Sequence, residues 1–537
     1  MVLPPPSSYT LKSFRWLADW DRDGTYGAAN ADISSYVLQC EYRWGMNKAY
    51  QEVAPPARMV LTLNNSSGAW SVAKSTATFS SLFKKGVLVK MSFTNTGDQV
   101  RDRFIGTITD LQLLPGIRGQ NIAILTVEDP MLRLLNTEYY SPLLTNVTTD
   151  AALSQLFEDA TIAYPYPHQY WMLGIDGASE LESTTTVFEN TITDFETGGT
   201  TLAFVGDNAD GGSGVSAQAY LRDVVLAEAG GKLFWDAVNG KFVFWNRYHV
   251  SDIDTSLAAS AGEVVLDAPI EYHFADDLNN IMNVEYELKQ VGTSADILYT
   301  SPNLPLSIIA GNTRKFTARY QDPDVPTARV GGINMIPPLA GLDYIANTAS
   351  DGSGSDVTSN LGISVQFNAS SANITLYNST AATLYVTKLQ LRGTALISHA
   401  RETAQFLDGV SVFAYGEFRR RMFLPLVQSA EFAQDYATAL VSRFRTPLSR
   451  FERLTRDLTF EPNAAALSVT VGSVFKYHDE KLEDDDTVYM VVGEEGLIRG
   501  GNNWQVTYVL EPVERNVFWI LGVTEHSELG ETTILAL

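Results

Sequence analysis

The stretch that most constrains the fold is residues 104–136, FIGTITDLQLLPGIRGQNIAILTVEDPMLRLLN. Its first part has the composition of a strand with one small residue, Gly106, inside it, and turn-forming residues follow at 115–120. Residues 122–127 alternate in side-chain type with a period of two, which predicts a second strand. Asp129 and Pro130 stop that strand, and Leu132 and Leu135 share one face of a short helical turn. The stretch therefore predicts a β-hairpin closed by a leucine-rich turn, which is architecture and not a catalytic element.

Two earlier runs show the same strand pattern. Apolar residues alternate over 59–63 and lead into the Asn-Asn-Ser-Ser-Gly turn at 64–68, and they alternate again over 87–93 after Gly86. Four strands with these turns, in this order, predict an antiparallel β domain over residues 36–140.

This order of strands, LTLNN, GVLVKM, FIGTI and TVED, resembles the first barrel of the hub proteins of tailed phages, the family at the tip of the tail tube and in related injection machines. The resemblance implies two related tube-like barrels per chain, and three copies that form a pseudo-sixfold ring matching a hexameric tube. It also implies a structural virion protein at the tail tip, made in the host cytoplasm, that holds the tube end and opens for DNA. Its implied partners are further copies of itself, distal tail or tube proteins, the tape measure, and a fibre or spike.

Length and composition agree with a folded chain of several domains. The chain has 537 residues, of which 45% are hydrophobic and 19% charged, and strand-like alternation far outnumbers helical patterns. With the resemblance, this predicts a mainly β fold with a few helices: two tail-tube-like β-barrels, an α/β middle region and an inserted β-sandwich. The expected domains are an N-terminal arm with an Asp-rich turn (1–35), a first barrel (36–140), an α+β middle domain (141–250), a second barrel (251–295 with 397–515), the inserted sandwich (296–396) and a C-terminal tail (516–537).

Three helices and one hairpin stand out in the rest of the sequence. Helices are expected over 149–161, 217–229 and 429–444, the last with Phe432, Tyr436, Leu440 and Phe444 four residues apart on one face. Asn239-Gly240 between two aromatic runs predicts a tight hairpin.

Charge and cysteine content exclude several classes of function. With 62 acidic and 38 basic residues the net charge is −24, which argues against adhesion to nucleic acid and is compatible with DNA passing without specific binding. Cys40 is the only cysteine, so an intrachain disulfide and a Cys-rich zinc site are excluded. Neither a signal core nor an apolar run long enough to span a membrane is expected from the sequence.

One motif resembles a metal site. Asp19, Asp21 and Asp23 alternate and are followed by Gly24, as at the start of a calcium loop. The twelfth position, where an EF-hand has Glu, holds Asn30. Two interpretations stay open: an Asp-Gly turn with solvated carboxylates, or a calcium site.

The standard catalytic motifs are missing from the sequence. There is no zinc-protease helix motif, nucleophile elbow or phosphate-binding loop, and the six histidines are scattered, so the chain is not expected to be an enzyme or to need a cofactor. Two alternatives to the hub interpretation remain. The aromatic segment 164–171 and the insert would bind host-surface glycan in a tail adhesin, or a carboxylate pair formed in space would make a tail-associated glycan hydrolase.

Overall fold

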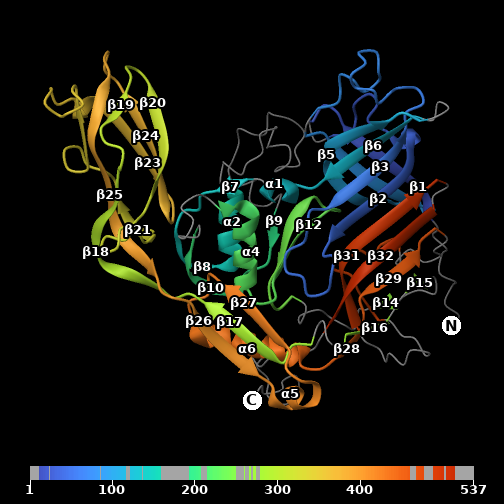
Figure 1. The fold of residues 1–537 in the computed structure, drawn as a ribbon. Helices are drawn as coiled ribbons and strands as arrows, with labels where there is room; N and C mark the ends of the chain where they lie inside the picture. Colours follow the sequence, from blue (N-terminus) through green and yellow to red (C-terminus); the bar gives the residue numbers. More distant parts are fainter. Residues whose placement is uncertain are drawn as a thin grey trace.

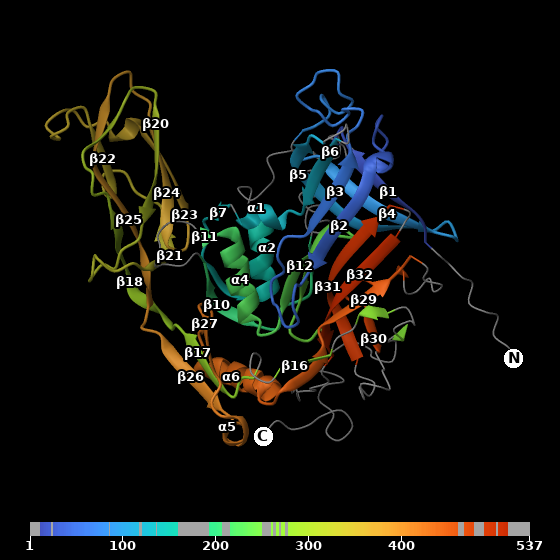
Figure 2. The same ribbon diagram turned by 45° about the vertical axis from the view of Figure 1, so that its right-hand side comes forward.

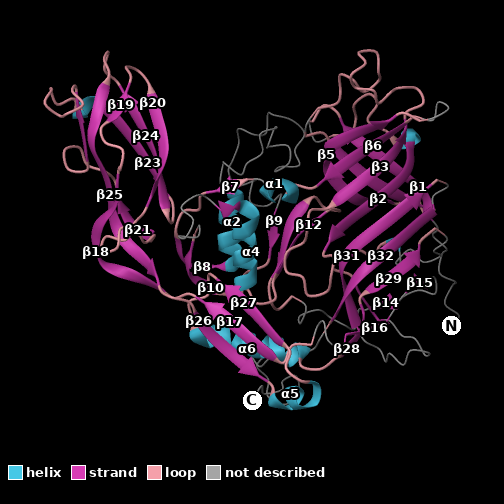
Figure 3. Ribbon diagram, viewed as in Figure 1, coloured by secondary structure: helices cyan, strands magenta, loops and turns pink. Residues whose placement is uncertain are grey.

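The computed structural model describes residues 11–22, 25–84, 86–116, 121–135, 137–158, 193–206, 215–249, 259–260, 265–267, 270–273, 278–459, 467–476, 488–500 and 503–513. Strands dominate this part of the chain, and five α-helices and two short 3-10 helices, η1 (Ser34–Tyr36) and η5 (Thr358–Asn360), accompany them (Figure 3). The prediction of a mainly β fold with a few helices is confirmed.

Six strands near the N-terminus form an antiparallel sheet in the order β1-β4-β5-β6-β3-β2. They are β1 (Leu11–Asp19), β2 (Val37–Gly45), β3 (Arg58–Asn64), β4 (Leu88–Asn95), β5 (Val100–Leu114) and β6 (Ile122–Glu128). β1 falls within the range expected to be an arm. It pairs with β4 because its own side chains alternate, with Phe14 and Trp16 turned into the core.

The expected hairpin is the β5–β6 pair. Ala123, Leu125 and Val127 are fully buried along β6, as the period of two predicted. Gly106 is needed in β5 because a Cβ there would lie 3.0 Å from the carbonyl oxygen of Glu128. The short helix α1 (Met131–Leu135) follows, but it buries Met131 and Leu134, one position earlier than the pair predicted.

The same sheet continues into strands from the C-terminal part of the chain. β2 pairs with β31 (Val488–Arg499), and the order runs on through β32 (Asn503–Pro512), β29 (Arg453–Asp457) and β15 (Val265–Asp267). β30 (Val474–Lys476) pairs with β31, and β14 (Ala259–Ser260) pairs with β30. β16 (Ile270–His273) pairs separately with β28 (Leu448–Phe451). The two predicted barrels therefore share one curled sheet of 12 strands, in which the blue and red strands lie side by side (Figure 1).

The middle region packs two helices beside small sheets. α2 (Thr149–Glu158) and α4 (Ala217–Ala227) lie together, and the hairpin of β12 (Lys232–Asp236) and β13 (Lys241–Trp245) turns at Asn239-Gly240 as expected. Short strands complete the region: β7 (Glu138–Tyr139), β8 (Leu144–Thr148), β9 (Thr193–Phe195), β10 (Thr201–Val205) and β11 (Val215–Ser216). The aromatic segment 164–171 lies outside the described residues.

Within the range expected for the second barrel, three strands form a separate sheet. β17 (Ile281–Tyr286) lies between β26 (Glu402–Leu407) and β27 (Arg419–Leu424), and the sheet packs on α6 (Ala430–Phe444). Tyr436 and Phe444 are buried on α6 as predicted, whereas Phe432 and Leu440 lie at the edge because Ala433, Ala437 and Val441 occupy the centre of the contact. A short helix, α5 (Gly409–Tyr415), was not predicted.

The insert has a core of its own. Its strands form two antiparallel sheets that enclose a second cluster of buried apolar side chains, separate from the main core. The strands are β18 (Lys289–Thr300), β19 (Leu306–Ile308), β20 (Thr313–Arg319), β21 (Gly331–Ile336), β22 (Tyr344–Asn347), β23 (Leu361–Phe367), β24 (Ser371–Asn378) and β25 (Leu384–Ser398). In both views the middle region lies between the insert and the large sheet (Figures 1 and 2). The exact domain boundaries stay a prediction.

Candidate functional site: the junction inside the large sheet and its outer face

The junction is the ladder between β2 and β31. Tyr42 lies opposite Gly496 and Gly45 lies opposite Gly493. A Cβ on Gly493 would clash with the carbonyl oxygen of Met46, and one on Gly496 would clash with the Tyr42 ring. Glycine at both positions lets the two strands and the chain after β2 approach closely, and Met46 then donates its N–H to the carbonyl oxygen of Val492 at 2.8 Å.

An ion pair is buried behind this ladder. Arg103 of β5 donates its Nε–H to Glu494 Oε1 of β31 at 2.7 Å, and its Nη2 donates to the carbonyl oxygen of Val469 at 2.8 Å. The Tyr42 hydroxyl donates to the same Glu494 oxygen at 2.8 Å, and Trp504 Nε1 donates to the Tyr42 hydroxyl oxygen at 3.2 Å. Residues from both ends of the chain therefore meet in one hydrogen-bonded cluster.

The electrostatics of the cluster depend on all of its members. The side chains of Arg103 and Glu494 are 3% and 0% exposed. Burial raises the pKa of Glu494, and the Arg103 charge and the Tyr42 hydroxyl act in the opposite direction. A buried ion pair contributes little net stability compared with apolar residues, but breaking it leaves an uncompensated charge. The cluster therefore acts chiefly to hold one register between β2, β5 and β31.

A second buried ion pair ties the middle region to the sheet. Lys232 of β12 donates to Glu511 Oε2 of β32 at 2.8 Å, and the same carboxylate oxygen accepts the Tyr50 N–H at 2.6 Å. Lys232 also donates to the carbonyl oxygen of Gln51 at 3.2 Å. The loop after β2, the middle hairpin and β32 are thus fastened at one point.

The neighbouring carboxyl group of Glu52 extends this connection to α6. The Tyr436 hydroxyl donates to Glu52 Oε1 at 3.3 Å. Burial raises the pKa of Glu52 to about 7, although the nearby Lys232 charge and the Tyr436 hydrogen bond act to lower it. Glu52 is therefore the group in this junction that is set to titrate near neutral pH.

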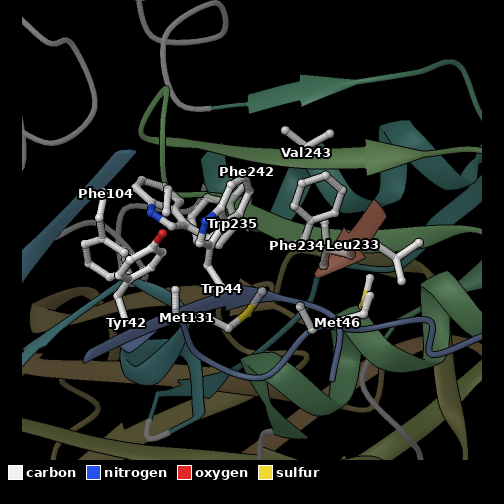
Figure 4. Close-up of a cluster of buried hydrophobic side chains, with 14 of the residues drawn as sticks. Tyr42, Trp44, Met46, Phe104, Met131, Leu233, Phe234, Trp235, Phe242 and Val243 are labelled. Carbon is white, nitrogen blue, oxygen red and sulfur yellow. The ribbon is translucent and has the colours of Figure 1, made fainter. Parts of the chain in front are cut away.

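Aromatic packing fills the space between these polar contacts. Figure 4 shows Tyr42, Phe104 and Trp235 drawn together, with Phe242 beside them. The rings of Tyr42 and Phe104 are 6.5 Å apart, and those of Trp235 and Phe242 are 5.0 Å apart. Trp235 Nε1 donates to the carbonyl oxygen of Ile105 at 3.4 Å. The junction is thus rigid by packing as well as by charge.

The opposite side of the same strands, here called the outer face, is polar and has nearly balanced charge. Along one row, Glu128 of β6, Arg58 of β3, Arg43 of β2 and Glu495 of β31 lie opposite one another in turn. On β6, β3, β2, β31, β32 and β29, together with Asp110 of β5, the charged residues of the outer face are Arg43, Arg58, Arg453, Arg499, Glu41, Glu128, Glu495, Asp110 and Asp457. Four guanidinium groups against five carboxylates give no basic stripe of the kind that grips phosphates.

The residues of the predicted calcium motif lie in different surroundings. Asp19 is fully buried, and its Oδ1 accepts the N–H of Arg22 at 2.9 Å, so that it closes the turn after β1. Asp21 is exposed, and Asp23 lies outside the described residues. Among the residues that the structure describes, no three His, Cys, Asp or Glu side chains are grouped to hold a metal. A buried Asp19 beside an exposed Asp21 matches a turn cap better than a shared ligand set, and calcium binding stays a prediction.

Sequence reasoning missed the junction residues. Arg103 and Glu494 are 391 positions apart, so no local motif connects them. The available signal is that a charged residue occupies an inward position of an alternating strand and has no oppositely charged residue on the same face nearby in sequence. Such a residue predicts a distant partner. No helix in the described part of the chain is long and apolar enough to cross a membrane.

Comparison with solved structures gives matches along nearly the whole chain. The tail protein from Neisseria meningitidis MC58 covers 93% of this chain and 96% of its own, at 9% identity and a TM-score of 0.46. The 43 kDa tail protein of prophage MuSo2 from Shewanella oneidensis covers 93% and 99%, at 10% identity and a TM-score of 0.43. Prophage tail protein gp18 from Listeria monocytogenes covers 93% and 94%, at 8% identity and a TM-score of 0.38.

This chain is similar to solved phage tail proteins. The identity to each of these three is at most 10%, so no residue's role carries over from them to this chain. No protein-family model and no curated protein matches its sequence.

Proposed function

We propose that this chain is a structural virion protein, the hub at the distal end of a phage tail. It closes or connects the tail tube, anchors fibres or a spike, and lets DNA pass. Its role is mechanical and not catalytic. The observation that carries the proposal is the 12-stranded sheet, in which strands from both parts of the chain are locked at β2 and β31 by the Arg103–Glu494 cluster. A part that holds the end of a tube needs such a stiff, continuous wall.

The outer face supports a passage for DNA. A duplex slides past a surface only where few cations displace its counterions. The paired row of Glu128, Arg58, Arg43 and Glu495 offers cations that are already opposed by carboxylates in adjacent strands. The outer face of the sheet is therefore the channel wall in this proposal, and its charge is near neutral although the net charge of the chain is −24.

Ring assembly would cover the free edge of the sheet. β1 pairs with β4 on one side, and on the other only residues 31–33 cover its C-terminal half, through the Ala18 N–H to Ala31 and the Ile33 N–H to Trp16. In the described part of the chain the rest of that edge has no partner strand. Exposed strand edges promote association. Three copies in a closed ring would satisfy these edges, and distal tail, tube, tape-measure and fibre or spike proteins are the proposed neighbours along the axis.

The test is the position and copy number of the chain in intact particles. Particles labelled with a specific antibody are imaged by electron microscopy, and the copies per tail are counted by quantitative mass spectrometry. Label at the distal tail end with three copies is expected. Label along side fibres, or complete absence from particles, would overturn the hub assignment, and one or two copies per tail would overturn the ring.

A second function, binding of host-surface glycan, is favoured by the separate core of the insert. A domain with its own core that stands away from the large sheet is free to contact other molecules (Figure 1). The full chain is applied to an array of cell-wall glycans. Glycan binding that is lost when exposed insert residues such as Tyr377 are changed to Ala supports an adhesin. If no glycan on the array binds, the insert acts as a spacer instead.

A further inference from the structure

The insert joins the rest of the chain through a narrow two-stranded neck. Leu288 packs on the main core, whereas Ile397 packs on the insert core, and between them Lys289 and Gln290 pair with Ser398 and Ile397. No third strand flanks the neck among the described residues until β21 joins β25 at Leu396. The two hydrophobic cores are therefore connected at this point by two paired strands, across which His399 Nε2 lies 3.0 Å from Gln290 Oε1.

The neck has features that set a bend. β18 shifts register against β25 between Val291 and Ala295, which places extra residues in one strand just above the neck. Such bulges bend and twist a strand pair locally. Below the bulge, Gln428 accepts the Lys289 N–H at 2.7 Å through Oε1 and donates through Nε2 to the carbonyl oxygen of Glu287 at 2.9 Å. One side chain from the residues just before α6 thus braces the pivot.

Close to the neck, the insert touches the middle region at one small dock among the described residues. Ala369, in the turn between β23 and β24, donates its N–H to the carbonyl oxygen of Ser141 at 2.8 Å. A Cβ added to Gly206 would lie 2.2 Å from the Cβ of Ala369, so only glycine at position 206 leaves room for the Ala369 methyl group. Leu143 lines the same spot. Among the described residues, one hydrogen bond and one methyl group make this contact, so the dock is small.

The turn that enters the dock is itself rigid. Ala369 accepts the Gly332 N–H at 2.8 Å, and Asn368 donates its N–H to the carbonyl oxygen of Ser371 at 2.8 Å. Asn368 and Ser371 are buried. A rigid turn, a small socket and a two-stranded neck allow the insert to move as one body when the turn leaves its socket.

We infer that the insert is a swinging arm, which pivots at the neck (residues 288–291 and 396–399) and is held in its docked position by Ala369 against Ser141 and Gly206. The inference deepens the proposed function, on which it rests for its purpose: release of the arm is the movement by which a tail-end protein would change on attachment. The arm's two positions, however, are properties of the purified chain and can be measured without a particle.

The experiment measures the distance between insert and body in the full chain by pulsed electron paramagnetic resonance. Spin labels are placed at Ser353 in the insert and at Ser66 in the turn after β3 of the large sheet. Both positions are exposed, and the background is Cys40→Ser. The unchanged chain should give one dominant distance. Gly206→Val fills the socket and should lower the ratio of docked to released arm at least about tenfold, which is a shift of ~1.4 kcal/mol.

Two further variants separate release from misfolding. Gly500→Val has nothing within 4 Å of its Cβ and should leave the distances unchanged. Adding Ala369→Gly to Gly206→Val removes the methyl group that the new side chain meets and should restore most of the docked population. An unchanged distribution in Gly206→Val that retains its thermal transition would overturn the arm. This outcome is independent of the tail-position test, so the two proposals can fail separately.

Discussion

Arg103 and Glu494 form a buried ion pair of 2.7 Å between strands 391 positions apart in sequence. Arg103 belongs to the set of strands near the N-terminus and Glu494 to the set near the C-terminus. Because each side chain is almost completely enclosed, the pair forms only when both sets occupy their final places. Breaking this contact should therefore destabilise the junction between the two sets of strands, which can be tested directly.

Arg103→Met is expected to destabilise the chain by about 3–5 kcal/mol, since it leaves Glu494 buried without its cation. Urea unfolding followed by tryptophan fluorescence measures the change, because Trp504 lies in the cluster. Replacing both partners, in Arg103→Met with Glu494→Leu, should restore most of the loss. A double variant as unstable as the single one would mean that the charges themselves support the fold.

Gly496→Ala is expected to lower stability by about 1–3 kcal/mol, because its new methyl group collides with the Tyr42 ring and displaces the hydroxyl that Glu494 accepts. Gly500→Ala in the same hairpin meets nothing within 4 Å and should change stability by less than about 0.5 kcal/mol. Thermal unfolding of the two variants side by side gives the comparison. Equal transitions would show that β2 and β31 have room to separate.

The Glu52 carboxyl should make stability fall as pH rises toward neutrality. Its pKa is raised from 4.5 to about 7 in the folded chain by burial, so between these values the folded state holds a proton that the unfolded state has lost. The stabilising contribution is complete below pH 4.5 and is lost as pH rises through 7. Compared with Glu52→Gln, the unchanged chain should lose on the order of 1–3 kcal/mol between pH 5 and 7.5. If the unfolding free energies of the unchanged chain and of Glu52→Gln changed equally with pH, Glu52 would not be the titrating group.

Charge reversal on the outer face should create an affinity for DNA that the natural face lacks. Asp110→Lys with Glu41→Lys places two exposed cations on one row that crosses β5, β6, β3 and β2. Binding of a labelled duplex, measured by fluorescence anisotropy, should appear at low salt and weaken steeply as salt rises. Asp296→Lys with Asp324→Lys makes the same change in net charge on the insert and serves as the control. Similar DNA binding by the outer-face and insert double variants would show that net charge alone, and not the outer face, controls the affinity.

Local patterns predicted local structure well in this chain. The Asn239-Gly240 turn, the alternation along β6 and the ends of α6 all depend on neighbours within a few residues, and the structure has them where the sequence indicated. The insert was also visible, because its turns and strands are continuous in sequence. These features follow from backbone preferences and from side-chain periodicity.

Long-range pairing was beyond sequence reasoning. β17, whose alternation suits any sheet, pairs in parallel with β27 and not with the strands of the large sheet, and nothing local decides between these partners. α5 was missed because Val410, Ser411 and Val412 alternate like a strand. The Asp408 side chain instead accepts the Ser411 N–H and starts a helix. The Lys232–Glu511 pair likewise has no signal short of the fold itself.

The pairing of β2 with β31 also has a consequence for how the protein is made. During synthesis the chain emerges from its N-terminus, and domains tend to fold as they appear. All strands of the insert lie between residues 289 and 398, so the arm can complete itself early. β2 must wait for β31, more than 400 positions later, before its free edge is covered. A chain that terminates before β31 therefore keeps an uncovered β2 edge and an Arg103 without its carboxylate. Such a chain lacks the completed sheet that assembly would need.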